Sequence, residues 1–315
     1  MDRIFTANYI KAIAETRNIS AAAESLGISQ PALSAYLKKL EDNVGVMLFD
    51  RSKKPLDLTE EGKVYLQFTD KVEALNKEFI QRISDIENMK SGQLTVGGAG
   101  FFNITYIPKA VAGFVSKYPG VDVEIIDGKI PDITAAALNG KIDLFITPVA
   151  DDERFHYEKL LREKIFICIP KGWSVNDDLG KTKRDGYRVL TEKDFERLKE
   201  STFVLLHKDQ HIGRKMKDIF DRYGFAPNHS VIVDQTMTSL ALTGAGVGIS
   251  LITESTIKNS GLKEYPAVYL ADEDICSREI FVAYPKNKYL SRATAKFIEI
   301  LKDVNSKITE NDEIT

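Results

Sequence analysis

The chain has 315 residues, and its 43 Lys and Arg residues against 46 Asp and Glu residues give a formal net charge of −3. With 43% hydrophobic and 28% charged residues it has a globular composition, which excludes a disordered chain, a fibrous repeat and a disulfide scaffold. At about 100–200 residues per domain, we expect two or three domains. The balanced charge excludes a uniformly basic nucleic-acid coat. It does not exclude a small DNA-binding module, because affinity for phosphate depends on where the cations lie rather than on the net charge.

Cellular location is constrained by three sequence features. The chain contains no apolar stretch near the roughly 18 residues of a membrane span. Residues 1–16 carry charges throughout, unlike a secretory signal. Cys168 and Cys276 lie far apart in apolar runs, so we expect buried free thiols. Together these features predict a cytoplasmic protein without membrane contact.

Residues 20–40 have the pattern of two short helices joined by a tight turn at Gly27. Ser29 and Pro31 are typical of the first turn of the second helix. At ~100° per residue, this helix has one apolar face and one face with short polar groups near its start and lysines further along. That arrangement is typical of a helix-turn-helix whose second helix enters the major groove of DNA. The expected DNA contacts on this helix are Ser29, Gln30, Pro31, Ser34, Ala35 and Lys38.

Beyond Gly45, two short extended runs flank a basic tip, which predicts a β-hairpin wing. Taken alone, the cations of this tip would be ordinary surface residues. Beside a helix-turn-helix, contact with the DNA backbone or the minor groove is the better interpretation. These cations are Arg51, Lys53 and Lys54.

Residues 59 to about 88 form one uninterrupted helical pattern that begins at a good cap, Thr59. Apolar residues recur at steps of three and four, close to the seam of a coiled coil. A rod of about 45 Å cannot bury such a stripe alone. A second copy of the chain is therefore the preferred partner, and packing on the chain's own C-terminal domain ranks second. The predicted dimerisation residues are Phe68, Val72, Leu75, Phe79, Ile83 and Ile86.

From Gln93 onward, short β-rich runs alternate with helical patterns, which predicts parallel sheets built from β-α-β units. The length favours two α/β lobes with a cleft between them. Residues 172–199 read as a polar surface excursion. The expected strands are 94–98, 121–126, 142–147, 203–206, 231–234, 247–251 and 280–284, and the expected helices are 106–117, 131–139, 211–223, 236–244 and 290–303.

Ligands of open α/β sheets bind at the carboxyl ends of strands, near helix N-termini whose free N–H groups favour anions. Small and polar residues beside the expected strands are therefore candidates for a small-molecule effector site. For any one of them, capping or turn formation is at least as good an interpretation. The candidates are Gly100, Asn103, Thr147, Thr202 and Gln235.

Other kinds of site lack support in the sequence. The glycine-rich run 244–248 follows a helix and precedes a strand, the reverse of a dinucleotide fingerprint. His207 and His211 are four residues apart but lack a third ligand, so a surface pair is the better interpretation. No nucleophile–base pair or phosphate-binding loop is apparent. We therefore expect no metal, no cofactor and no enzyme.

The first 60 residues resemble the LysR-type transcriptional regulators, and the layout behind them is also similar to that family. One departure is Ala35-Tyr36, where the family usually has Arg-Gln, so a common polar contact is lost. The matching residues are Phe5, Ala22-Ala23, Leu26, Ser29-Gln30-Pro31-Ala32-Leu33-Ser34, Leu40-Glu41, Gly45, Leu48-Phe49, Arg51, Leu58-Thr59 and Gly62.

The resemblance implies three parts. The first is an all-α winged helix-turn-helix at residues 1–58, and the second is a dimerisation linker helix at 59–90. The third, residues 91–315, is an α/β two-lobed regulatory domain of periplasmic-binding-protein type II-like architecture. Within it, the first lobe is expected at about 92–163 and 269–304, and the second at about 164–268.

The resemblance also implies a sequence-specific transcription regulator whose DNA binding or activation is modulated by an effector between the lobes. Expected partners are double-stranded DNA, a small and possibly anionic effector, and the chain itself as dimer or tetramer. RNA polymerase is a further candidate. The alternatives are a solute-binding protein, which the first 90 residues disfavour, and an α/β enzyme, which the missing catalytic pattern disfavours.

Overall fold

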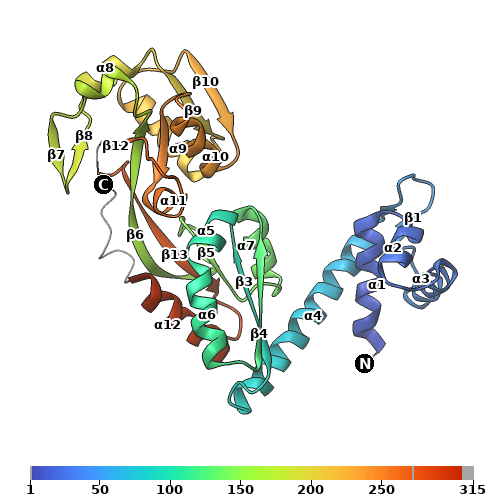
Figure 1. Ribbon diagram of the computed structural model, residues 1–315. Helices are drawn as coiled ribbons and strands as arrows, with labels where there is room; N and C mark the ends of the chain where they lie inside the picture. The colour runs from blue at the N-terminus through green and yellow to red at the C-terminus, as the bar shows by residue number, and fades with distance from the viewer. Residues whose placement is uncertain (1, 272, 307–315) are drawn as a thin grey trace.

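The computed structural model describes residues 2–271 and 273–306. A small helical domain lies at one end of a long helix, and two α/β lobes follow from its other end (Figure 1). In these ranges, no helix has the length and apolarity needed to cross a bilayer. The tail at 309–315, which the sequence suggests is frayed, and the side chain of Phe5 lie outside what the structure describes.

The N-terminal domain packs three helices, α1 (Asp2–Thr16), α2 (Ile19–Ser25) and α3 (Gln30–Val44). Asn18 caps α2, because its side-chain oxygen accepts hydrogen bonds from the N–H groups of Ser20 and Ala21. The predicted helix-turn-helix is thus present as α2 and α3. Its core consists of Ile10, Ile13, Ala22, Ala23, Leu33, Leu37, Leu48 and Phe49.

The predicted hairpin is also present. Strands β1 (Phe49–Asp50) and β2 (Asp57–Leu58) pair antiparallel, with Phe49 opposite Leu58. The basic tip occupies the loop between them. Phe49 is buried in the domain core, so the wing is packed against the helices rather than projecting freely.

Helix α4 (Glu60–Ile86) has 27 residues, which corresponds to about 40 Å. Thr59 caps it by accepting a hydrogen bond from the Gly62 N–H at 2.9 Å, and the Thr59 hydroxyl donates to the Met47 carbonyl at 2.7 Å. Gly62 is required here, because a Cβ would lie 2.0 Å from the Leu48 carbonyl oxygen. The start of the rod is therefore fixed to the wing.

The first lobe is built on parallel strands. Strand β3 pairs with β4 on one side and β5 on the other. Helices α6 and α12 pack together over this sheet (Figure 1). The elements are β3 (Gly92–Gly98), α5 (Gly100–Thr105), α6 (Ile107–Lys117), β4 (Val121–Asp127), α7 (Ile130–Leu138), β5 (Leu144–Thr147) and α12 (Arg292–Ser306).

Two long antiparallel strands, β6 (Phe155–Ile169) and β13 (Ser277–Pro285), join the lobes. The first half of β6 pairs with β13, which also pairs with β5 of the first lobe. The second half of β6 pairs with β11 (Ser250–Thr253) and β12 (Ala267–Leu270) of the second lobe. The two strands can be followed from lobe to lobe in Figure 1.

The second lobe has a separate core around the buried residues 165–169 of β6. Its parallel pair is β9 (Thr202–Leu206) and β10 (His229–Val233). The remaining elements are a 3-10 helix (Ser174–Asp177), β7 (Thr182–Arg184), β8 (Tyr187–Val189), α8 (Glu192–Leu198), α9 (His211–Arg222), α10 (Thr236–Gly244) and α11 (Glu254–Lys258).

The structure differs from the sequence-based expectations in three respects. The sheets are mixed rather than parallel, because β13, β11 and β12 run antiparallel to β6. The segment 172–199 contains the β7–β8 hairpin and α8 as well as loops. The chain returns to the first lobe along β13 rather than at about residue 269, because β12 pairs with residues 167–169 of β6. Cys168 and Cys276 are both buried, as expected.

Candidate DNA-binding and effector-binding sites

Helix α3 presents one face to the domain core and the other to solvent. Leu33 and Leu37 are fully buried, whereas Pro31, Ala35 and Lys38 are exposed. Ser29 caps the helix by accepting a hydrogen bond from the Ala32 N–H. The expected apolar and polar faces of this helix are therefore present. The polar face begins at the end of the helix that, in a helix-turn-helix, enters the groove.

Gln30 and Ser34 lie side by side on this exposed face. The Gln30 side-chain nitrogen Nε2 donates to the Ser34 hydroxyl oxygen at 3.0 Å. The second N–H of that amide, its carbonyl oxygen and the Ser34 hydroxyl proton remain for other partners. One helical turn thus offers both donors and an acceptor to a base edge, as adenine recognition requires.

Two of the three cations of the wing, Arg51 and Lys53, lie beside carboxylates. Buried Glu41 of α3 accepts hydrogen bonds from the Leu48 N–H at 2.8 Å and the Phe49 N–H at 3.4 Å, and it pairs with Arg51 at 2.8 Å. Lys53 lies 3.8 Å from Asp57 at the base of the wing. Lys54 is exposed and has no ion pair among the described residues. The Arg51 side chain remains half exposed, so it can also meet a ligand.

The apolar stripe of α4 is uncovered in the single chain. Exposure is 53% for Phe68, 68% for Leu75 and 62% for Phe79, and Val72 is half-buried. Ile83 and Ile86 extend the stripe to the end of the helix, and both are exposed. The second-ranked expectation, that this stripe packs on the chain's own C-terminal domain, is therefore wrong.

The opposite face of α4 holds the first lobe through polar contacts. Asp143, just before β5, pairs with Lys77 at 2.8 Å and accepts a hydrogen bond from the Gln81 amide at 2.9 Å. Further along the helix, Asp85 accepts a hydrogen bond from the Tyr289 hydroxyl at 2.7 Å. Because these contacts occupy the polar face, the docked helix turns its apolar stripe outward.

Three effector candidates lie at one edge of the first lobe. Gly98 of β3 pairs with Ile146 of β5, so the loops after these strands, which contain Gly100 and Asn103 on one side and Thr147 on the other, are neighbours. The Asn103 amide donates to the Gly98 carbonyl at 3.1 Å, and its buried Oδ1 has no hydrogen bond to any described residue. Thr147 is buried, and its hydroxyl bonds within its own turn to Val149.

The structure does not place Thr202 with the other candidates. Thr253, which pairs with Ile165, is the end of β11 toward the first lobe. Strand β9 runs parallel to β11, since Phe203 forms a parallel bridge with Ile249. Thr202 is therefore at the far end of β9, about 13 Å along the strand from Leu206. The sequence places Thr202 before a strand, whereas ligands of open α/β sheets bind at the end after the strand.

The segment after Leu206, rather than Thr202, lies at the end of β9 that faces the first lobe. Gln235 follows β10 at the same end of the strand pair, and Gln210 donates to the Asp234 carbonyl at 3.0 Å, which ties the two loops together. His211 begins α9, and its Nδ1 is buried without a hydrogen bond to any described residue. Burial, together with the positive charge of Arg278, lowers the pKa of His211 to about 3. His211 is therefore a half-buried imidazole that its surroundings hold neutral, rather than half of a surface pair.

The part of the chain that the structure describes gives no support for a metal site. No group of three or more His, Cys, Asp or Glu side chains within residues 2–271 and 273–306 is arranged to hold a metal ion. Burial raises the pKa of the Cys168 thiol above its ordinary value, so that thiol is an inert interior group.

A winged domain with an exposed recognition helix, joined by a long helix to a two-lobed α/β domain, defines a ligand-regulated DNA-binding protein. Two family models match the chain. A bacterial regulatory helix-turn-helix protein model of the lysR family matches residues 6–63, and the LysR substrate binding domain matches residues 87–306. The chain belongs to the LysR family of transcriptional regulators, which is not a class of enzymes.

Similar proteins span nearly the whole chain. A probable RuBisCO transcriptional regulator of Phaeodactylum tricornutum is 26% identical over 307 residues, 95% of this chain and 96% of the relative. The uncharacterized HTH-type transcriptional regulator YcgK of Bacillus subtilis is 23% identical over 304 residues, 94% and 92% of the two chains.

Solved structures with the same fold include CbnR, a LysR family transcriptional regulator, alone and in complex with its target DNA. Each has a TM-score of 0.66 and is 20% identical to this chain, and each match covers 95% of this chain. The match covers 98% of free CbnR and 99% of the DNA-bound chain.

Proposed function

We propose that the exposed face of α3 enters the major groove of an operator and that Gln30 and Ser34 read base edges there. Ser29 and Pro31 set the start of the helix, while Ala35 lies on the groove face without a polar contact to offer. The supporting observation is the burial of Leu33 and Leu37, which leaves the polar face outward. The fold shared with CbnR, solved with its target DNA, supports the same placement.

Phosphate contacts come from cations around this face. Lys38 lies further along α3, and Arg51, Lys53 and Lys54 lie on the wing. The Arg51–Glu41 pair fixes the guanidinium relative to α3, so the wing and the recognition helix approach DNA as one rigid surface. Cations of this kind position a protein on the duplex, whereas base contacts provide specificity.

A second copy of α4 covers the stripe formed by Phe68, Val72, Leu75, Phe79, Ile83 and Ile86. The steps of three and four residues suit paired helices, and the polar face is already docked on the first lobe. Two-fold pairing places two recognition helices on one duplex, which predicts a pseudo-palindromic operator. The working division of the chain is residues 1–58, 59–90 and 91–315.

An effector binds between the lobes at the loops after β3, β5, β9 and β10. Gly100, Asn103 and Thr147 shape the first-lobe side, and Gln235 with Gln210 and His211 shapes the second-lobe side. A Cβ on Gly100 would lie 3.1 Å from the Asp127 carboxylate. An effector that is anionic would therefore also need a hydrogen-bond donor or a cation that faces Asp127.

The test is selection of bound fragments from the host genome, followed by titration of one selected duplex at several salt concentrations. Four phosphate contacts per copy predict that log affinity falls linearly with log salt, with a slope near −0.9 for each phosphate neutralised. A scrambled duplex of equal length is the control for specificity. Affinity that does not depend on salt, or equal affinity for both duplexes, would contradict the proposed interface.

A further inference from the structure

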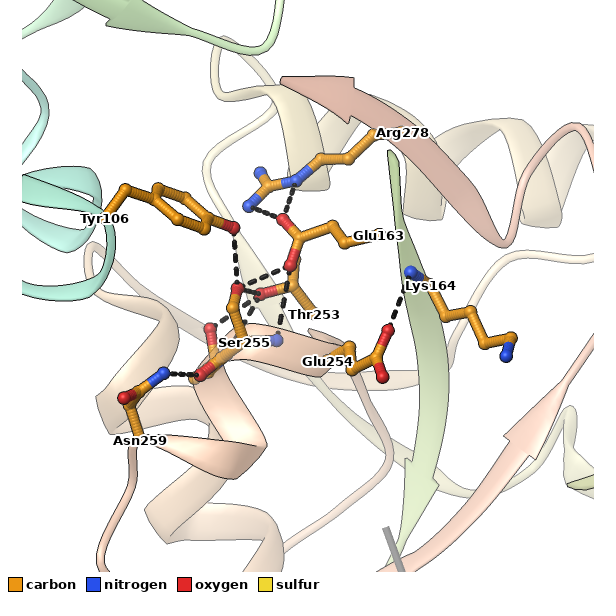
Figure 2. A network of polar contacts seen from close by, with 9 residues as sticks. Tyr106, Glu163, Lys164, Thr253, Glu254, Ser255, Asn259 and Arg278 are labelled. Carbon is orange, nitrogen blue, oxygen red and sulfur yellow. Dashed lines mark hydrogen bonds and ion pairs between the residues drawn. The ribbon is translucent and has the colours of Figure 1, made fainter. Parts of the chain in front are cut away.

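A buried ion pair lies where the two connecting strands pass from one lobe to the other. Glu163 of β6 stands directly opposite Arg278 of β13, and their side chains are only 4% and 5% exposed. The Arg278 Nε donates to Glu163 Oε1 at 2.6 Å, and a second guanidinium nitrogen lies 2.5 Å from the same oxygen. Figure 2 shows this pair at the centre of a larger network.

The network reaches into both lobes. The Ser255 hydroxyl, near the start of α11 in the second lobe, donates to Glu163 Oε2 at 2.5 Å, and the Ser255 N–H donates to the same oxygen at 3.2 Å. The Tyr106 hydroxyl, from the first lobe, donates to Ser255 Oγ at 3.1 Å (Figure 2). A continuous chain of hydrogen bonds therefore links the first lobe, the second lobe and the connecting strands.

Such a network favours one relative placement of the lobes. Removing two charges from water is costly, and only well-aligned partners compensate for that cost. If the lobes rotated so that these atoms moved apart by a few ångströms, a buried carboxylate or hydroxyl would lose its hydrogen-bond partner. That loss costs more free energy than sliding one apolar surface over another. The same strand pair contains a register shift between Ile280 and Phe281, two residues beyond Arg278. Irregular pairing of this kind bends a strand and supplies a place for rotation.

The network also touches the proposed effector loop. Helix α5 starts at Gly100, and its Phe102 ring lies 5.3 Å from the Arg278 guanidinium and 6.0 Å from the Tyr106 ring. Helix α5 also contacts α11. A shift of α5 on one side of the joint would therefore disturb the hydrogen bonds on the other.

We propose that Tyr106, Ser255, Glu163 and Arg278 form an interlobe latch. The latch holds the lobes in one orientation while its hydrogen bonds are made, and its release lets them rotate about the irregular segment of β13. Movement of α5 is the event that would release it, so the latch connects the effector loop to the arrangement of the lobes. This last link rests on the proposed effector site, whereas the latch itself does not.

The test measures the distance between lobes by pulsed electron spin resonance, without DNA or effector. Spin labels are placed on cysteines introduced at exposed Lys109 in α6 and exposed Lys193 in α8. Both native cysteines are buried. Labelled chain is diluted with unlabelled chain, so that only distances within one chain contribute. We expect one narrow distance distribution for the parent protein.

Tyr106→Phe is the decisive variant, because it removes only the hydroxyl and keeps the ring beside Phe102. Loss of one neutral hydrogen bond is expected to raise the population of the second orientation about fivefold. Glu163→Gln is expected to raise it further, since it removes the charge that Arg278 and Ser255 both bind. The matched control is Glu279→Gln, which breaks the exposed pair with Lys159 at 2.5 Å on the same two strands.

A broadened or two-peaked distribution in Tyr106→Phe, with the parent distribution in Glu279→Gln, supports the latch. The parent distribution in Tyr106→Phe would overturn it, whatever happens to Glu163→Gln. Equal broadening in Glu279→Gln would also overturn it, because the effect would then belong to the strand pair in general. Because neither DNA nor effector is present, failure of the latch and failure of the DNA or effector sites are distinguishable.

Discussion

Glu41 shows how a single buried side chain organises the proposed DNA-binding surface. Its carboxylate satisfies the Leu48 and Phe49 N–H groups and pairs with Arg51 of the wing. Buried N–H groups without an acceptor cost free energy. Glu41 therefore fixes the backbone at the start of the wing as well as the Arg51 side chain. The sequence predicts Arg51 as a cation beside DNA, but only the structure shows the carboxylate that holds it.

Gln30→Ala should relax operator preference. The variant loses a side chain that can pair bidentately with a base, which is worth ~1–3 kcal/mol of discrimination. The fold should persist, because Gln30 is exposed at the start of α3. Competition between the selected duplex and a single-base variant at each position measures the effect, and unchanged discrimination at every position would refute a base-reading role.

Lys38→Ala is the matched comparison on the same helix face. A lost phosphate contact should weaken binding to all duplexes alike and reduce the magnitude of the salt slope by about 1, with base preference unchanged. Titration of both variants at three salt concentrations separates the two roles. A preference changed by Lys38→Ala but not by Gln30→Ala would reverse the assignment.

His211 should make the stability of the regulatory domain depend on pH. Its pKa is lowered to about 3 in the folded chain, mainly by burial, from an ordinary value of 6.5. Between these values the unfolded chain binds a proton that the folded chain does not, so stability falls as pH drops below 6.5. The contribution is at most ~1.4 kcal/mol per pH unit.

Urea unfolding at pH 6.5 and pH 5 measures this effect. The parent protein should lose more stability than His211→Gln over this interval. His229→Gln, at an exposed position on β10, is the control and should follow the parent protein. If His211→Gln loses as much stability as the parent protein, the fold does not hold the imidazole neutral.

At the scale of elements, helix α4 is divided between two tasks. Its polar face docks on the first lobe through Lys77, Gln81 and Asp85, and its apolar stripe faces solvent. Single exposed apolar residues are common on protein surfaces. A continuous apolar stripe along a helix of about 40 Å is instead typical of an interaction surface. We therefore expect a partner to cover this stripe in the working protein.

Phe79→Glu should dissociate the proposed dimer. A charge at the centre of the stripe cannot be buried against a second helix, and loss of a central aromatic anchor costs on the order of 3 kcal/mol, or about a hundredfold in dimer affinity. Gln67→Glu adds the same charge at an exposed position outside the stripe. Sedimentation equilibrium should show monomers for the first variant only. Dimers that persist in Phe79→Glu would move the interface elsewhere.

Element prediction succeeded where the pattern is local. The faces of α3 and the stripe of α4 follow from helical periodicity, and the caps at Ser29 and Thr59 follow from local hydrogen bonding. Strand β6 was not predicted, because its 15 residues pass through two cores and its periodicity changes on the way. The orientation of β9, and with it the position of Thr202, depends on pairing with β11, which no local pattern reveals.

At the scale of the molecule, the division into a DNA-binding head, a rod and a regulatory domain can be tested by truncation. A fragment that starts at residue 87 keeps Met89, which is buried in the core of the first lobe. It should unfold cooperatively, and it should not bind the selected duplex, since α3 and the wing are absent. Circular dichroism and gel retardation measure the two properties. DNA binding by the fragment would refute the proposed division.

The sequence alone determined the helix-turn-helix, the wing, the rod and the existence of two α/β lobes, because these depend on periodicity, caps and turns within short segments. It also determined the resemblance that the family models confirm. Only the tertiary structure decided which strands cross between the lobes, which end of β9 faces the first lobe, and that Tyr106, Ser255, Glu163 and Arg278 meet. These residues are separated by up to 172 positions (278 − 106), and their contact depends on how the strands pair.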